Sequence, residues 1–183
     1  MSKKYELVVD DTITFWGWKL FRIKALISFG SVDAGDLGGY IYTEDNLSQE
    51  GDAWVSGDAK VWGNAEVSGN AEVSGNAKVS GNAEVSGDAE VSGDAEVSGD
   101  AEVWGDAKVS DLEDVIVFKN HWSSGRHFTY TRSNKMWKVG CFYGTGQELI
   151  DKAYQDNDKS GNYYKAYVEF VEKLEALDEL KRS

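Results

Sequence analysis

Between Gly51 and Ser110 the apolar positions of the chain recur with a strict period of six. Each unit carries an alanine and, two positions later, a valine, so that both lie on one face of a short β-strand. Gly followed by Asn or Asp separates the units, and these residues tolerate the left-handed backbone of a tight corner. The pattern predicts short strands joined by corners. The inward valines are Val55, Val61, Val67, Val73, Val79, Val85, Val91, Val97, Val103 and Val109.

Written from its valine, the repeated unit is V-S-G-N-A-E. It resembles the hexapeptide-repeat signature of left-handed parallel β-helices, in which three units make one triangular coil. The resemblance implies a mainly β fold with coils of 18 residues in this sequence. Repetition fits a solenoid, because each coil buries its apolar face only against its neighbours. A disordered low-complexity tract is the alternative, and the strict placement of valine disfavours it.

Coils of this length sort the outward residues into three columns. One holds Trp54, Glu72, Glu90 and Lys108, a second holds Lys60, Lys78 and Glu96, and the third holds Glu66, Glu84 and Glu102. The third column has no cation, although carboxylates about 4.8 Å apart repel only weakly through water. This acidic face has two interpretations: a solubilising surface, or a contact surface that occupies a nucleic-acid groove on a partner.

The segment before the hexads predicts an N-terminal β cap over residues 1–30, with Gly17 as the turn of a hairpin. The β-helix itself is expected over residues 31–110, with regular hexads over 51–110 and an irregular first coil before them. In that first coil, counting back from the hexads places Leu37 and Ile41 inward. Three tryptophans interrupt the repeat and either pack under an adjacent cap or contact a partner: Trp54, Trp62 and Trp104.

Residues 111–183 predict a C-terminal α+β module with three strands, VIVFKN, HFTYTR and MWKVGCFY. Thr145 and Glu148 form a capping box that begins a helix ending near Asn157. The segment KSGN separates it from a second helix over about 162–181. That helix carries an apolar stripe, which packs either on the strands or on a neighbouring subunit. Its members are Tyr163, Tyr167, Phe170, Val171, Leu174 and Leu177.

Both flanks of the repeat carry a more specific resemblance. The leader RIKALISFGSVDAGDLGGYI with NLSQEGDAWV, and the tail HFTYTRSNKMWKVGCFYGTGQELIDKAY, resemble a family of hexapeptide-repeat proteins carried by bacteriophages and prophages. The resemblance implies a phage or mobile-element protein built on a left-handed β-helix. It brings no catalytic residues.

The bulk composition narrows the class of protein. A net charge of −13 disfavours sequence-independent nucleic-acid binding, which needs surplus Lys and Arg to neutralise phosphates. The single cysteine, Cys141, excludes an intrachain disulfide and a cysteine-cluster metal site. No signal peptide is recognisable, and no apolar run approaches the roughly 18 residues of a membrane span. We therefore expect an intracellular protein, which in a phage setting means the host cytoplasm.

The chemistry of the chain gathers between Val115 and Gln147, where there is no Asp or Glu. Cations and rings interleave there, as a nucleotide, a nucleic-acid strand or an acidic protein surface requires. The candidate contact residues are His121, Trp122, Arg126, His127, Tyr130, Arg132, Lys135 and Trp137. Alternation puts Phe128 and Tyr130 on one face of a strand. His127, Thr129 and Thr131 share the other, where they are expected to line a polar pocket with Arg126 and Arg132. In the alternative interpretation, the aromatics face the helices and the cations neutralise acidic neighbours.

Known chemistries of the fold find little support. Hexapeptide acyltransferases use a histidine beside the coils, and no His occurs before residue 121. γ-Class carbonic anhydrases need three metal-binding histidines, whereas this chain has two. Cys141 as a nucleophile requires a neighbouring base such as His121 or His127, and a buried strand position is its more ordinary interpretation. We predict no catalytic residue, no metal site and no cofactor.

The sequence therefore favours a non-catalytic binding protein, in which a stiff solenoid presents two end modules. In a phage setting the expected partner is a host antiviral defence protein or an anionic signalling nucleotide. It is bound by the C-terminal module or by the acidic face. An acyltransferase-like enzyme and a virion or assembly component are the alternatives. Relatives of this fold associate about threefold axes, so we expect a homo-oligomer, a trimer in preference to a dimer.

Overall fold

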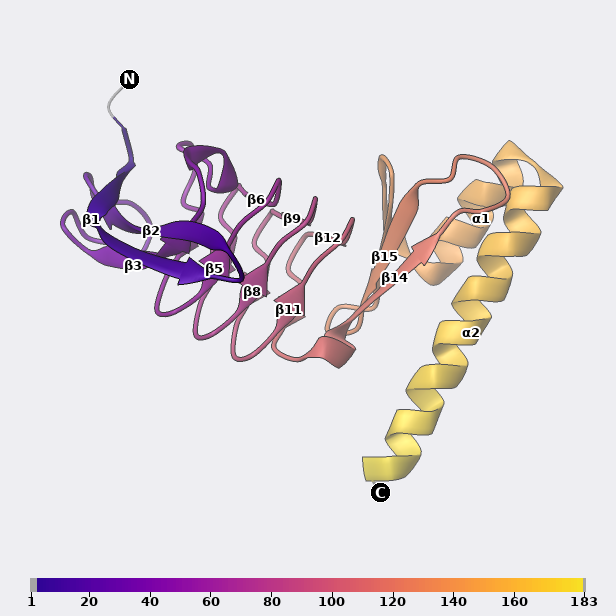
Figure 1. Cartoon of the computed structure of the whole chain (residues 1–183). Helices are drawn as coiled ribbons and strands as arrows, with labels where there is room; N and C mark the ends of the chain where they lie inside the picture. Colours follow the sequence, from indigo (N-terminus) through magenta and orange to yellow (C-terminus); the bar gives the residue numbers. More distant parts are fainter. Residues whose placement is uncertain (1–2, 183) are drawn as a thin grey trace.

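The valine column of the hexads forms the core of a parallel β-solenoid. The protein is described here by a computed structural model covering residues 3–182 (Figure 1). The predicted fold class is confirmed: a mainly β chain with a solenoid of about four turns, an antiparallel C-terminal sheet and a helical end. Within the described residues, no helix combines the length and apolarity needed to cross a membrane.

Ten strands of two residues each form the regular coils. They are β4 (Trp54–Val55), β5 (Lys60–Val61), β6 (Glu66–Val67), β7 (Glu72–Val73), β8 (Lys78–Val79), β9 (Glu84–Val85), β10 (Glu90–Val91), β11 (Glu96–Val97), β12 (Glu102–Val103) and β13 (Lys108–Val109). Strands 18 residues apart pair in parallel, for example Val67 with Val85 and Val85 with Val103. Three sheets result: β4-β7-β10-β13, β5-β8-β11 and β6-β9-β12. The repeat alanines and valines inside are at most 1% exposed, so the interior is a continuous apolar column.

Glycine at each corner is required by both conformation and space. Gly69 has φ +68°, in the left-handed region that side chains disfavour. A Cβ on Gly69 would also meet the backbone of Gly87, one coil on, at 3.0 Å. Stacked glycines therefore set how closely the coils approach.

Beside the glycines, the Asn and Asp residues of successive coils form hydrogen-bonded columns. Asn64 donates through Nδ2 to Asn82 Oδ1 at 3.1 Å, and Asn82 donates to Asp100 Oδ1 at 2.9 Å. At the next corner, Asn70 donates to Asp88 at 3.0 Å. Each column thus tightens the contact between neighbouring coils.

The N-terminal segment continues one face of the solenoid. The strands β1 (Tyr5–Phe15) and β2 (Trp18–Ala25) form a hairpin whose turn residues, Trp16 and Gly17, both have positive φ. Strand β2 pairs antiparallel with β3 (Leu37–Ile41), and β3 pairs parallel with β5. The resulting sheet has the order β1-β2-β3-β5-β8-β11.

The first coil corrects one prediction about its phase. Leu37 is 58% exposed rather than inward, whereas Ile41 is fully buried and pairs with Val61, 20 residues later. Leu47, which follows the 3-10 helix η1 (Glu44–Asn46), bridges to Val67 with the same offset. From Leu47 to Val55 there are eight positions instead of six. This two-residue insertion explains why counting back from Val55 selects the wrong leucine.

The N-terminal module covers the first coil. Tyr5, Ile23 and Ala25 belong to the same buried cluster as the valines. Trp54 is 4% exposed, with the rings of Tyr5 and Phe29 against it at 6.3 and 5.4 Å. Trp62 is likewise buried. For these two tryptophans the structure confirms packing under the adjacent cap.

The backbone of the solenoid gives its two ends opposite polarity. Each coil donates its N–H groups to carbonyls of the following coil, as from Ser56 to Val73 and from Ser74 to Val91, both at 2.8 Å. The first coil is therefore left with a rim of acceptors and the last coil with a rim of donors. Buried backbone groups need partners, so the two ends require different chemistry.

Each end module supplies the group that its rim lacks. At the N-terminal rim, Lys4 Nζ donates to Ala53 O at 2.9 Å, and Tyr5 Oη donates to Leu47 O at 2.7 Å. At the C-terminal rim, Thr129 Oγ1 accepts from the Glu102 amide at 2.9 Å, and Ser133 Oγ accepts from the Lys108 amide at 2.7 Å. Both ends of the solenoid are thus capped by complementary side chains.

The C-terminal module starts with the 3-10 helix η2 (Leu112–Asp114). A four-stranded antiparallel sheet follows, made of β14 (Val115–Lys119), β15 (His127–Thr131), β16 (Met136–Val139) and β17 (Phe142–Thr145). MWKVGCFY is therefore two strands and not one, because Gly140, with φ +55°, turns the chain between them. Cys141 lies exposed in that turn, not buried in a strand.

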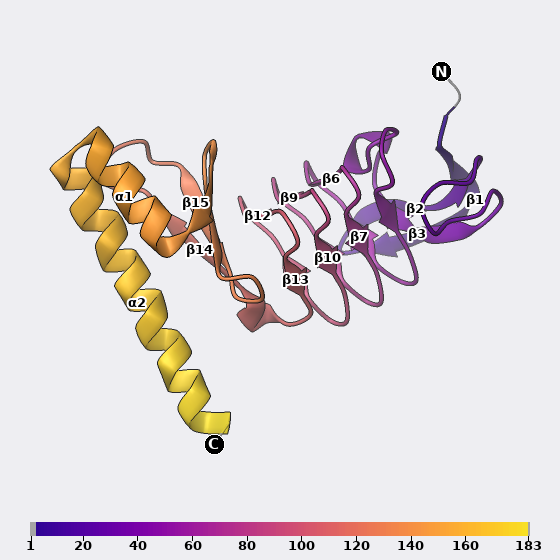
Figure 2. The ribbon, with the colours of Figure 1, turned by 180° about the vertical axis from the view of Figure 1, so that it is seen from behind.

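Two helices complete the chain, α1 (Gly146–Asp156) and α2 (Asp158–Arg182). The predicted capping box at Thr145 and Glu148 is confirmed. The predicted start of the second helix is wrong, because KSGN lies within α2 and the break falls at Asn157. The sheet lies between the last coil and the helices in both views (Figures 1 and 2).

Candidate binding surfaces of the end modules

The alternation along β15 decides what each of its side chains meets. Phe128 and Tyr130 point to the helices and join a buried cluster with Trp137 and residues of α1 and α2. His127 and Thr129 point to the last coil of the solenoid. The predicted division of this strand into two faces is confirmed.

On the solenoid side, cations of the sheet pair with carboxylates of the last coil. His127 Nδ1 lies 2.8 Å from Asp100 Oδ2, and Lys138 Nζ lies 3.2 Å from Glu102 Oε2. Lys138 also stands over the Trp104 ring, 4.4 Å from its centroid. Trp104 itself remains 37% exposed, so the cap covers it only in part.

A groove of about 330 Å³ runs along this junction. It is lined by Asp100, Glu102, Arg126, His127 and Gly140. Of the cations in it, Arg126 has no carboxylate within ion-pair distance among the described residues. With two carboxylates in its wall, the groove is poorly suited to a phosphate.

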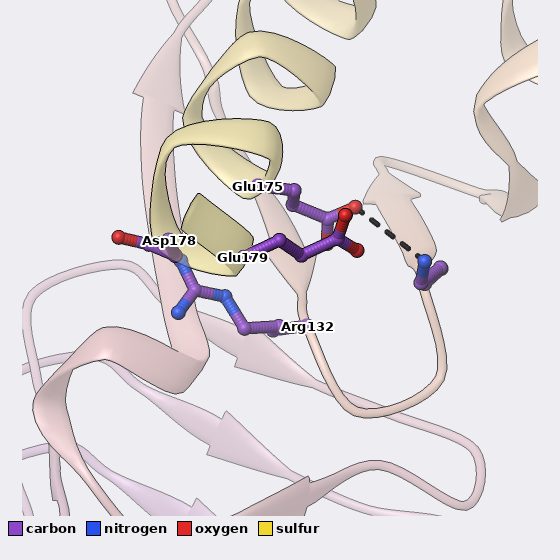
Figure 3. Close-up of a pocket in the computed structure, with 5 residues that line it drawn as sticks. Arg132, Glu175, Asp178 and Glu179 are labelled. Carbon is purple, nitrogen blue, oxygen red and sulfur yellow. Dashed lines mark hydrogen bonds and ion pairs between the residues drawn. The ribbon is translucent and has the colours of Figure 1, made fainter. Parts of the chain in front are cut away.

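Arg132 and Lys135 lie elsewhere, around a hollow of about 150 Å³ against α2 (Figure 3). Arg132 contacts Asp178 at 2.7 Å, and Lys135 lies 3.6 Å from Glu175. Tyr130 donates its hydroxyl to Glu175. Burial, followed by Glu175, raises the pKa of Tyr130 above its ordinary value. These contacts fasten the sheet to the helix.

The remaining candidates, His121 and Trp122, lie in the β14–β15 loop. The Trp122 ring stacks on Tyr163 of α2 at 4.6 Å with an interplanar angle of 7°. His121 meets both rings edge-on, at 5.4 and 5.3 Å. The Trp122 indole Nε1 is buried and has no hydrogen-bond partner. Trp137, in contrast, is 1% exposed and belongs to the core.

The structure therefore does not gather the eight candidates into one pocket. Arg126 and His127 line the junction groove, whereas Arg132 and Lys135 face α2 on a separate surface. Tyr130 and Trp137 are buried. The arrangement supports the interpretation in which aromatics face the helices and cations neutralise acidic neighbours. His121, Trp122 and Arg126 are the candidates with exposed or half-exposed side chains and no ion pair.

The acidic face forms as predicted. Glu66, Glu84 and Glu102 lie in register on β6, β9 and β12. The pKa of Glu84 is raised, first by partial burial and then by Glu102 and Glu66, whereas Lys138 lowers it. The row has no cation of its own, but Lys138 from the C-terminal sheet neutralises its last member.

Sequence reasoning missed an aromatic cluster at the hairpin tip, formed by Phe15, Trp16, Trp18, Tyr42 and Trp62. Trp16 is 71% exposed although it stacks on Phe15 at 4.9 Å. Trp18 meets Tyr42 edge-on at 4.7 Å. The available signal was W-G-W at a turn, a place where polar residues are usual.

Exposed large apolar side chains are confined to the two ends of the described chain. None lies between Tyr42 and Trp104, across the regular coils. The N-terminal set is Val9, Trp16, Trp18, Leu26, Ile27, Leu37 and Tyr42, and the C-terminal set includes Trp104, Leu112, Val117, Tyr154, Phe170 and Leu177. The solenoid thus presents a polar surface and its modules present apolar ones.

Groups able to hold a metal are not found in residues 3–182, where no three His, Cys, Asp or Glu side chains are suitably clustered. In comparisons with known proteins, no protein-family model matches the chain and no curated protein matches it.

Proposed function

We propose that this chain is a non-catalytic binding protein whose solenoid holds two contact modules at a fixed separation. The observation that carries the proposal is the distribution of exposed apolar side chains, which occur on both modules and not on the regular coils between them. Contiguous exposed apolar surface is typical of interaction sites.

The hairpin-tip cluster is the surface best suited to a foreign partner. Trp16 and Trp18 project from a turn that β2 and β3 anchor to the solenoid sheet. Lys78 lies 5.6 Å from the Trp16 ring centroid and adds a cation beside the aromatic surface. Trp is enriched at the energetic centres of protein interfaces. The partner that fits is a protein with an apolar pocket and acidic surroundings.

A protein is favoured here over a signalling nucleotide. Arg132, Lys135 and Lys138, which a nucleotide would need, are each paired with a carboxylate of the same chain. Freeing them would cost the contacts that hold the module together. The resemblance to phage-carried proteins adds the expectation that the partner belongs to a host antiviral defence.

The test uses immobilised full-length protein exposed to a bacterial host lysate, with captured proteins identified and quantified by mass spectrometry. Trp16→Ser together with Trp18→Ser should abolish capture of a discrete partner. Val9→Ser is the matched control, because Val9 is 69% exposed on the same hairpin but away from its tip, and it should leave capture unchanged.

Equal capture by the wild type and the double variant would overturn the assignment of the hairpin tip. Calorimetry with nucleotides examines the competing ligand class. Heats that vanish with Arg126→Ala or Arg132→Ala would replace the protein partner by a nucleotide.

A further inference from the structure

Helix α2 carries two apolar stripes, and only one of them is used within the chain. Tyr164, Val168 and Val171 are buried against α1 and the sheet. The second stripe, which we call the α2 seam, occurs at alternating intervals of four and three residues. Its members are Tyr163, Tyr167, Phe170, Leu174 and Leu177.

The seam is only partly covered by its own module. Phe170 is 48% exposed and Leu177 is 57% exposed, whereas the other three members are half-buried. An open groove of about 560 Å³ lies beside its C-terminal half, with Leu112, Ile116 and Leu174 in its lining. A smaller apolar hollow of about 280 Å³ is formed by Ala166, Tyr167 and Phe170.

The C-terminal part of α2 extends beyond the sheet (Figures 1 and 2). An isolated helical segment is marginal in water, because most helical stability comes from packing an apolar face. The projecting part nevertheless keeps the seam in line through Leu174 and Leu177. A long helix with an apolar stripe beyond its own support needs a partner surface.

The intervals of the seam indicate what that surface is. A stripe with alternating steps of four and three repeats every 3.5 residues on average, the period at which two helices keep their seams together. With Tyr167 and Leu174 at the first core position, Lys173 and Asp178 occupy the flanking positions that face each other across a parallel pair. Opposite charges would then meet beside the seam.

We infer that the α2 seam binds the α2 seam of a second copy of this chain, in parallel orientation. The inference rests on the proposed function, since it gives the C-terminal module to self-association and leaves the hairpin tip for the foreign partner. The resulting assembly would project several solenoids from one helical junction.

Sedimentation velocity tests the association. The wild type should sediment as a species of at least twice the 20.2 kDa of one chain. Leu177→Glu should raise the dissociation constant on the order of thirtyfold or more, as for loss of an interface hot spot. Leu37→Glu is the matched control, because Leu37 is 58% exposed on the opposite module, and it should associate like the wild type.

Cysteine cross-linking tests the orientation in a Cys141→Ser background, since Cys141 is exposed. Under oxidation, Leu177→Cys should form a covalent dimer because parallel seams place the two copies of residue 177 side by side. Glu179→Cys, off the seam, should not.

A wild type that is monomeric at every concentration, or equal association of wild type and Leu177→Glu, would overturn self-association. Equal cross-linking of both cysteine variants would overturn the parallel seam. Neither result bears on the Trp16-dependent capture, which fails or succeeds separately. Circular dichroism confirms that each variant is folded.

Discussion

At the scale of single residues, the choice between Asn and Asp decides whether a corner column relays a hydrogen bond or ends it. Asn accepts and donates, so Asn82 links Asn64 to Asp100. Asp only accepts when ionised. Columns that reach Asp therefore need a donor from outside, and the C-terminal module provides one: Asn134 Nδ2 donates to Asp106 at 3.1 Å.

This chemistry predicts substitutions of opposite sign. Asn82→Asp should destabilise the protein by about 1 kcal/mol, because the new carboxylate loses the donor to Asp100 and faces its charge. Asp88→Asn should stabilise it by a similar amount, since Asp88 precedes Asp106 in its column and an amide can donate to it. Urea unfolding at neutral pH measures both. Shifts of the same sign would contradict the relay.

Glu84 gives a prediction about pH. Its pKa is raised, so its contribution to stability is full below the unfolded pKa of about 4.3 and is lost as pH rises through the folded pKa. Glu84→Gln should therefore raise the free energy of unfolding at about pH 7, by about 0.5 kcal/mol after solvent screening. The gain should vanish at about pH 3, where both residues are uncharged.

Glu72→Gln, on the neighbouring face between Trp54 and Glu90, is the control for Glu84→Gln and should give a smaller gain. A gain from Glu84→Gln that persists unchanged in acid would show that packing, not charge, is responsible.

Much at this scale was predictable and some was not. The inward valines and the column of Glu66, Glu84 and Glu102 follow from period alone. The ion pairs do not, because Arg132 meets Asp178 from an element 46 residues away and no local pattern encodes that approach. For the same reason, the candidate cations looked available in the sequence although most are paired.

At the scale of elements, the two caps work through opposite hydrogen-bonding roles. Lys4 illustrates the strain of this arrangement: its ammonium donates to backbone carbonyls, and burial lowers its pKa to about 8 while Asp52 opposes the shift. The unfolded chain therefore binds more protons between that value and the ordinary lysine pKa. In that range Lys4 makes the stability of the protein rise with pH.

Removing one capping group should open one rim and leave the other closed. Thr129→Val keeps the shape but leaves the buried Glu102 amide without an acceptor, at a cost of about 1–3 kcal/mol. Lys4→Met should do the same to the carbonyl of Ala53. Hydrogen exchange measured by mass spectrometry should increase mainly at the last coil for Thr129→Val and mainly at the first coil for Lys4→Met. Uniform increases along the solenoid would contradict independent caps.

The elements themselves were predicted where the sequence is periodic and missed where it changes phase. The insertion before Val55 moves Leu37 outward, and no hexad marks where the two extra residues enter. Gly140 divides a segment that reads as one strand, since a single glycine is compatible with a strand as well as with a turn.

At the scale of the whole molecule, the solenoid behaves as a spacer whose length is set in whole coils. Deleting residues 69–86 removes one complete coil and joins Ser68 to Gly87 without changing the phase. The shortened protein should fold, keep its self-association and lose about 4.8 Å of length. Small-angle scattering and thermal unfolding check this.

Deleting residues 69–77 instead removes half a coil and places later valines at corner positions. That variant should fail to fold cooperatively. Cooperative folding of both deletions, with equal midpoints, would mean that the coils do not need to stay in phase.

The opposite polarity of the two rims also limits polymerisation. A copy that lost only its C-terminal module would expose amide donors, and every other such copy would expose the same donors, so two of them have nothing to exchange. Endless head-to-tail stacking requires a bare acceptor rim to meet a bare donor rim. Proteolysis at one end alone therefore leaves a finite particle, and a fibre can grow only where both modules have been cut away.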